Sequence, residues 1–208
     1  PIAGEHDGLR FGDVQRAIID RRLPDDIGLV GFFEAVTTEA GQQIISVAEH
    51  WLRQHGRNIL RGPINFTIWG TYRCSCSEDQ PPYALEPFSR AYYPGIFESS
   101  GWSVAHQNVS TIQPLNSTNV VGEKKDYEVC QSAGFVFARP TETSVPEHLQ
   151  AAYQISRQSF KDAWNYVPIT FDEFSHVFIT DARQQDLSLI DMVTDQARKP
   201  VAFIFAVP

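Results

Sequence analysis

The fold of this chain follows from one stretch, GLVGFFEAVTTEAGQQIISVAEHWLRQHG, which runs from Gly28 to Gly56. Its first part, Gly28–Val36, is rich in residues that favour β structure and predicts a strand. Thr37 or Thr38 offers an N-cap, and the apolar residues that follow recur at helical spacing as far as His55. A strand that passes directly into an amphipathic helix indicates a mixed α and β fold.

The rest of the chain predicts further elements on both sides of this stretch. Before it, apolar runs separated by Asp- and Pro-containing turns predict strands at 9–11 and 14–20. After it, β-favouring runs predict strands at 58–60, 64–69, 102–112, 129–138, 187–193 and 201–207. Helical spacing predicts helices at 89–100 and 149–164, and Thr170-x-x-Glu173 is a capping box that begins another. The expected class is α+β (α/β-type, three-layer), with helices on a central, mostly antiparallel mixed sheet.

The composition is that of a globular protein with a hydrophobic core. Of its 208 residues, 42% are hydrophobic and 20% are charged. With 25 acidic and 17 basic residues the net charge is −8, which argues against nucleic-acid and anionic-membrane partners. The longest apolar run, Pro200–Pro208, is short of the about 20 residues that a transmembrane helix needs.

The three cysteines cannot all pair with one another, and no stretch has the pattern of a signal peptide. We therefore expect reduced thiols and a cytoplasmic location. No metal site is expected, because Cys74-x-Cys76 lacks a second pair of ligands and His50 and His55 face different sides of their helix.

Basic residues gather in one region of this acidic chain. Residues 51–73 contain no acid and four arginines, Arg53, Arg57, Arg61 and Arg73. Such a region suits a phosphate or an acidic partner. The alternative is that these charges complement a helix dipole or belong to ordinary surface, and we prefer that alternative for Arg53.

Several strings, spread over most of the chain, carry a family resemblance when taken in order. They are Val30-Gly-Phe-Phe-Glu-Ala35, Ala48-Glu-His-Trp-Leu-Arg53, Arg61-Gly-Pro-Ile-Asn-Phe-Thr67, Ala91-Tyr-Tyr-Pro-Gly-Ile-Phe-Glu-Ser-Ser-Gly-Trp102, Phe160-Lys-Asp-Ala-Trp-Asn-Tyr-Val-Pro-Ile-Thr170, Asp172-Glu-Phe174 and Pro200-Val-Ala-Phe-Ile-Phe-Ala-Val-Pro208. In this set and order, the chain resembles the GNAT superfamily of acyl-CoA N-acyltransferases. More narrowly, it is similar to long, tandem-type bacterial GNAT-like proteins.

The resemblance implies how the chain is organised. Residues 1–138 match the later part of one GNAT-like unit, 139–148 a hinge, and 149–208 the opening helices and strands of a second unit. The chain starts at Pro1 and stops just after an apolar run. We therefore expect the middle of a tandem pair, with a permuted single unit as the alternative.

The activity that the resemblance implies is transfer of an acyl group, such as acetyl, from an acyl-CoA to an amine. The expected partners are a small-molecule amine and either a second copy of the chain or a flanking domain. The alternative is a non-catalytic ligand-binding or interaction module that keeps the fold. For this segment taken alone, the alternative gains support because the loop Thr37–Gln42 lacks the family's glycine-rich pyrophosphate signature and carries Glu39, whose charge opposes a phosphate.

Particular residues follow from this comparison and from their own chemistry. Glu34 is the expected general base, since burial among apolar neighbours would suit it, although strand alternation would instead turn it to solvent. Phe97 occupies the place of the tyrosine that serves the family as general acid, so we expect Tyr92 or Tyr93 to take over that role. The alternative is that both are half-buried structural tyrosines.

The resemblance also implies where ligands bind. The cofactor would contact the central strand and the start of the helix at Phe33, Ala35, Val36 and Thr38. Asn65 and His106 are the expected substrate-binding residues, each with a structural alternative.

Overall fold

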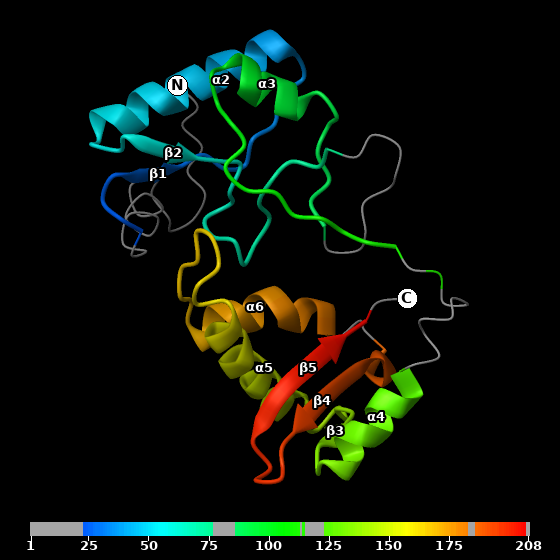
Figure 1. Cartoon of the computed structure of the whole chain (residues 1–208). Helices are drawn as coiled ribbons and strands as arrows, with labels where there is room; N and C mark the ends of the chain where they lie inside the picture. The colour runs from blue at the N-terminus through cyan, green and yellow to red at the C-terminus, as the bar shows by residue number, and fades with distance from the viewer. Residues whose placement is uncertain (1–22, 77–85, 113, 115–122, 183–185, 207–208) are drawn as a thin grey trace. The chain divides into compact units, whose positions relative to one another are not determined.

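The structure is a computed structural model that describes residues 23–76, 86–112, 114, 123–182 and 186–206. The strands expected at 9–11 and 14–20 lie outside these residues. The described residues divide into two compact units, the first holding those between 23 and 105 together with 163–167, the second those between 106 and 162 together with those from 168 to 206. Helices accompany a small sheet in each, so the class is α+β, as predicted (Figure 1). Within the described ranges no helix is both long and apolar enough to span a membrane.

The first unit is built on a parallel β–α–β crossover. Strand β1 (Ile27–Leu29) pairs in parallel with β2 (Ile59–Arg61), and helix α2 (Thr38–Gln54) connects them. Thr37 is the N-cap, since its hydroxyl oxygen accepts the Ala40 N–H at 3.2 Å. The helix predicted from Thr37 or Thr38 is therefore confirmed.

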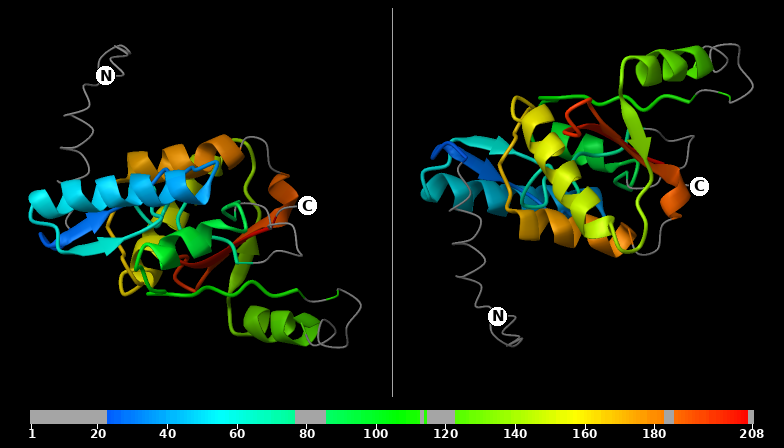
Figure 2. Two further views of the ribbon diagram at one scale, coloured as in Figure 1. Left: turned by 90° about the horizontal axis from the view of Figure 1, so that it is seen from above. Right: turned by 90° about the horizontal axis from the view of Figure 1, so that it is seen from below.

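The core of the first unit lies between α2 and a short helix, α3 (Tyr93–Ser99). It consists of buried side chains from both helices and from the segment after β1, namely Phe33, Ile45, Tyr93, Ile96 and Phe97. Figure 2 shows α3 beside α2. The first unit thus places the end of β1 against the tyrosine-bearing start of α3.

The strand predicted at 28–36 is present only at its start, because β1 ends at Leu29, and the strands predicted at 64–69 and 102–112 are wrong. Residues 64–69 form a tight turn in which Asn65 N–H donates to Thr71 O and Thr67 N–H donates to Asn65 O. Proline at 63 cannot donate a ladder hydrogen bond, and Phe66 has a φ of 67°, which ends extended structure. Residues 103–112 are exposed and form no ladder, so their polar alternation does not reflect a sheet face.

In its described residues, the second unit combines an antiparallel sheet with three helices and a 3-10 turn. Its helices are α4 (Glu123–Ser132), α5 (Val145–Ser159) and α6 (Phe171–Ala182), and the 3-10 turn is Leu187–Leu189. The strands β3 (Val136–Ala138), β4 (Ile190–Thr194) and β5 (Pro200–Phe205) pair in the order β3-β4-β5, and α5 lies against β5 (Figure 2).

The second unit tests several local predictions. The capping box is confirmed, because Glu173 N–H donates to Thr170 Oγ1 at 3.2 Å and Thr170 N–H donates to Glu173 Oε2 at 2.8 Å. The strand predicted at 129–138 is wrong in its first half, where the residues to Ser132 complete α4. Gly134 follows with a φ of 84°, and only then does β3 begin. The helix predicted at 149–164 ends early, at Ser159.

The single central sheet that we expected is not present in the described part of the chain. The strands form two sheets, one parallel and two-stranded, the other antiparallel and three-stranded. The ladder of the first sheet is short because Gly62-Pro63 interrupts it. The assignment of residues 1–138 and 149–208 to two GNAT-like units stays a prediction.

Candidate functional site

The candidate site begins where the parallel ladder of the first unit ends. Past β1 and β2, Val30 N–H donates to Arg61 O and Ile64 N–H donates to Val30 O, each at 2.9 Å. The next link uses a side chain, because Phe32 N–H donates to Asn65 Oδ1 at 2.6 Å. At Phe32, the hydrogen bond between two main chains is therefore replaced by one from the main chain to the side chain of Asn65. Asn65 is one of the two predicted substrate-binding residues.

Gly31 lets the two segments approach at this point. A Cβ at this position would lie 2.2 Å from the carbonyl oxygen of Ile64, which is backbone and cannot rotate away. The close approach of backbone to backbone requires a residue without a side chain.

The predicted acid and base residues meet just beyond this point. The Tyr93 hydroxyl donates to Glu34 Oε2 at 2.5 Å and accepts the Ala35 N–H at 3.2 Å. The Tyr92 hydroxyl donates to the carbonyl oxygen of Ala35 at 2.8 Å. Both backbone polar groups of Ala35 are thus bound to tyrosines of the α3 start, and the structure brings Glu34, Tyr92 and Tyr93 together.

The electrostatics of this cluster distinguish the two tyrosines. Burial raises the pKa of Tyr93, and the hydrogen bond and negative charge of Glu34 raise it further, against a lowering by the Ala35 N–H. Tyr93 therefore keeps its proton and directs it to Glu34. Tyr92 is 41% exposed, so its hydroxyl is the one that a ligand can reach.

Glu34 itself is exposed, which agrees with the solvent-facing alternative from strand alternation. Its carboxylate is held by Tyr93 from one side and open to solvent on the other. Among the described residues no salt bridge involves it. A carboxylate in this state can accept a proton from a ligand or bind a cation.

The predicted cofactor-binding residues occupy different environments. The Phe33 side chain is buried against the rings of Tyr93 and Phe97, so only its backbone remains for a ligand. Val36 is 90% exposed, and Thr38 is exposed at the first position of α2. A ligand that pairs with the Ala35 backbone must first replace the hydroxyls of both tyrosines.

His106, the other predicted substrate-binding residue, is exposed and belongs to the second unit. It is therefore not part of the site assembled in the first unit.

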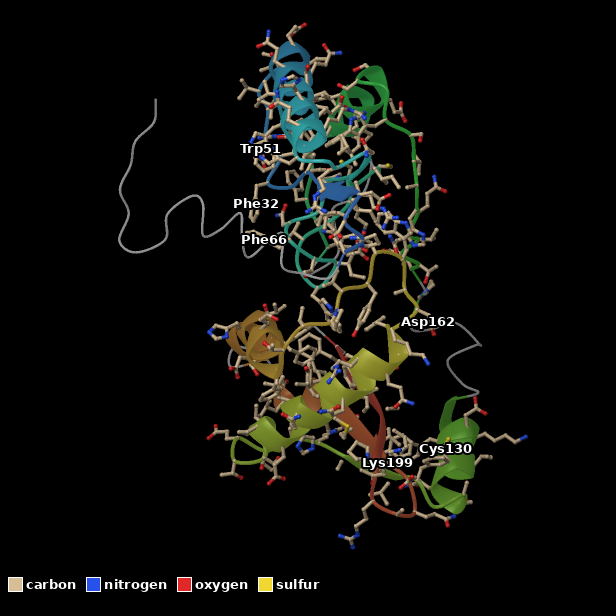
Figure 3. All side chains as sticks on the ribbon, turned by 90° about the vertical axis from the view of Figure 1, so that its left-hand side faces the viewer. Phe32, Trp51, Phe66, Cys130, Asp162 and Lys199 are labelled. Carbon is tan, nitrogen blue, oxygen red and sulfur yellow. The ribbon has the colours of Figure 1, made fainter. Side chains whose placement is uncertain are left out.

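An aromatic pair next to the site was not predicted. Phe32 and Phe66 meet edge to face with ring centroids 4.9 Å apart, and they are 63% and 41% exposed (Figure 3). Both have left-handed backbones, with φ of 52° and 67°, which is costly for a bulky residue and is concentrated at functional sites. No local pattern announces a positive φ at phenylalanine, so the signal would have had to come from the neighbouring Gly31 and Asn65.

The cysteines allow a test of this part of the fold. Burial, followed by the charge of Cys76, raises the pKa of the Cys74 thiol to about 11. At about pH 8 a thiol with that pKa is ionised to roughly one part in a thousand. We expect iodoacetamide to label the exposed Cys76 well before Cys74, as followed by peptide mass spectrometry. Equal labelling rates of Cys74 and Cys76 in the native protein would contradict the burial of Cys74. In urea, where the protein is unfolded, the two rates should become equal.

In the described ranges, no group of three or more His, Cys, Asp or Glu side chains is arranged to hold a metal ion. Comparison of the chain with protein-family models, with curated proteins and with solved structures finds no match.

Proposed function

We propose that the first unit carries the site of an acyl-CoA-dependent N-acyltransferase, which moves an acetyl or other acyl group to a small amine. The observation that supports this most directly is the Glu34–Tyr93 hydrogen bond, with Tyr92 beside it, at the point where two parallel strands stop pairing. The strings that resemble GNAT proteins include this segment, Val30 to Ala35, and the tyrosines at the start of α3.

The residues divide the chemistry as follows. The amine nitrogen attacks the thioester carbonyl, the C–N bond forms, and Glu34 accepts the proton that the amine loses. The C–S bond breaks as Tyr92, whose hydroxyl first turns away from the Ala35 carbonyl oxygen, protonates the leaving sulfur. Tyr93 is a positioning residue, since it is buried and its proton is directed at Glu34. The proton on Glu34 is then lost to solvent, and Tyr92 is reprotonated from solvent, which both side chains reach.

A second candidate is a ligand-binding module without catalysis. Phe97, at the place where the resemblance would put the acid, is 6% exposed and has no proton to donate. Glu39 lies in the first turn of α2, where its charge disfavours a pyrophosphate. These observations favour binding of a ligand other than CoA.

The test is a calorimetric titration of acetyl-CoA into the full chain, together with an assay for thiol release over a panel of primary amines. We expect binding with a Kd below about 1 mM. Glu34→Gln should lower kcat by about 100-fold or more, because it removes the base. The matched control is Glu98→Gln, an exposed acid on α3, which should leave kcat unchanged.

The outcomes separate the two candidates. Acetyl-CoA binding with thiol release that depends on Glu34 supports the acyltransferase. The absence of both acetyl-CoA binding at about 1 mM and thiol release would overturn the acyltransferase proposal. Binding without release from any amine would favour the non-catalytic module.

A further inference from the structure

The four arginines of residues 51–73 differ in their surroundings. Arg73 forms a salt bridge with Glu86 at 3.6 Å, and Arg57 donates to the carbonyl oxygen of Asp25. Arg53 is exposed in the last turn of α2, where it complements the helix dipole. Arg61, at the end of β2, is partly buried and has no acidic partner among the described residues.

Arg61 is nevertheless held in place by neutral groups. Its Nη1 donates to Asn165 Oδ1 at 2.7 Å, and its guanidinium lies over the ring of Trp164, with 5.2 Å from Cζ to the ring centroid. A partly buried guanidinium that is bound by an amide and a ring keeps its full positive charge and most of its N–H donors.

Asn165 contributes a donor of its own. The residue is 8% exposed, and its Nδ2 is buried without a hydrogen-bond partner. Because Arg61 donates to Oδ1, the amide orientation is fixed, and the unpartnered Nδ2 belongs to the same amide group that binds the guanidinium. A buried N–H group without an acceptor costs free energy and calls for an explanation.

The segment that carries Asn165 is fixed independently of Arg61. Trp69 Nε1 donates to the Val167 carbonyl oxygen at 2.8 Å, and the Trp69 and Tyr166 rings meet at 5.9 Å. Residues 163–167 belong to the first unit, as Arg61 and Trp69 do. The donors of Arg61 and Asn165 are therefore organised before any ligand binds.

We propose that Arg61 and Asn165 form a binding site for a small oxyanion, the carboxylate or phosphate group of a ligand. Such a group supplies only acceptors and a negative charge, which are the two things that this pair lacks. The guanidinium edge accommodates two oxygens of a carboxylate or phosphate, and Nδ2 can donate to one of them. The site does not include Glu34, Tyr92 or Tyr93, so the proposal stands apart from the acyltransferase.

The experiment is thermal unfolding of the full chain with inorganic phosphate or with acetate, at an ionic strength held constant with sodium chloride. With a Kd near 1 mM, about 20 mM of the preferred anion should raise the unfolding midpoint by on the order of 4 °C. A rise with phosphate alone assigns the site to phosphate groups, and a rise with acetate assigns it to carboxylates.

Two variants complete the test. Asn165→Asp keeps an acceptor for Arg61 but replaces the Nδ2 donor with a second carboxylate oxygen. The negative charge of this carboxylate pairs with the Arg61 guanidinium in place of a bound anion. The substitution should abolish the anion-dependent rise while leaving the protein folded. Arg53→Gln, which removes an exposed arginine of the same region, should leave the rise intact. An equal rise in Asn165→Asp, or no rise above that in sodium chloride for either anion, would overturn the proposal.

Discussion

Replacing Phe174 by alanine is expected to lower the free energy of unfolding of the second unit by about 3–5 kcal/mol. Phe174 is 2% exposed and is among the largest fully buried side chains. Its ring lies 4.4 Å from that of Phe178 and 5.4 Å from that of Tyr153, centroid to centroid, so it joins α6 to α5. Truncation removes this apolar contact and leaves a cavity that the neighbouring rings fill only in part.

The measurement is urea unfolding followed by circular dichroism. Val177→Ala is the matched control, because it shortens a 40% exposed side chain on the same helix and should cost less than about 1 kcal/mol. If both variants lost the same stability, Phe174 would not occupy the core of this unit.

Replacing Gly31 by alanine is the second change for which we expect a large effect. The new Cβ would lie 2.2 Å from Ile64 O and 2.8 Å from the Ile64 carbonyl carbon, and the backbone must separate to relieve both contacts. We expect a loss of at least about 3 kcal/mol in the free energy of unfolding, at the upper end of what overpacking costs. The hydrogen bond between Val30 and Ile64 and that between Phe32 and Asn65 should weaken together.

Gly95→Ala supplies the control for this substitution. A Cβ at Gly95 meets nothing within 4 Å, and alanine within α3 should stabilise the protein by about 0.5–1 kcal/mol through helix propensity. The two Gly→Ala variants should therefore shift the urea midpoint in opposite directions. A Gly31→Ala protein as stable as Gly95→Ala would show that the two backbones are not in contact.

Local sequence predicted the helices well where side chains settle the helix ends by themselves. Thr37 caps α2, and Thr170 with Glu173 forms the capping box of α6, as expected from their spacing. It failed where a strand needs a partner. Residues 64–69 and 103–112 have β-favouring or alternating patterns, yet the structure gives them no ladder, because a strand exists only when a neighbouring segment pairs with it.

The candidate site shows the same division. From the sequence, Glu34 was suggested by its chemistry and Tyr92 and Tyr93 by the family resemblance, each residue separately. Their hydrogen bonds join residues up to 59 positions apart and assign distinct surroundings to the two tyrosines, one buried and one exposed. The exposed Phe32–Phe66 pair gave no sequence signal, since its positive φ values depend on the turn that Asn65 holds.

By itself, the sequence determined the mixed α and β class, the helix after Thr37 with its cap, and the residue types available for acid–base chemistry, whereas the parallel pairing of β1 with β2 came only from the structure. These depend on interactions within a few residues, which a local pattern contains. Only the tertiary structure decided which of these residues meet. Arg61 and Asn165, 104 positions apart, share a hydrogen bond because Trp69 anchors the segment around Asn165. Contacts at such separations depend on the packing of the whole unit, and no short stretch of sequence encodes them.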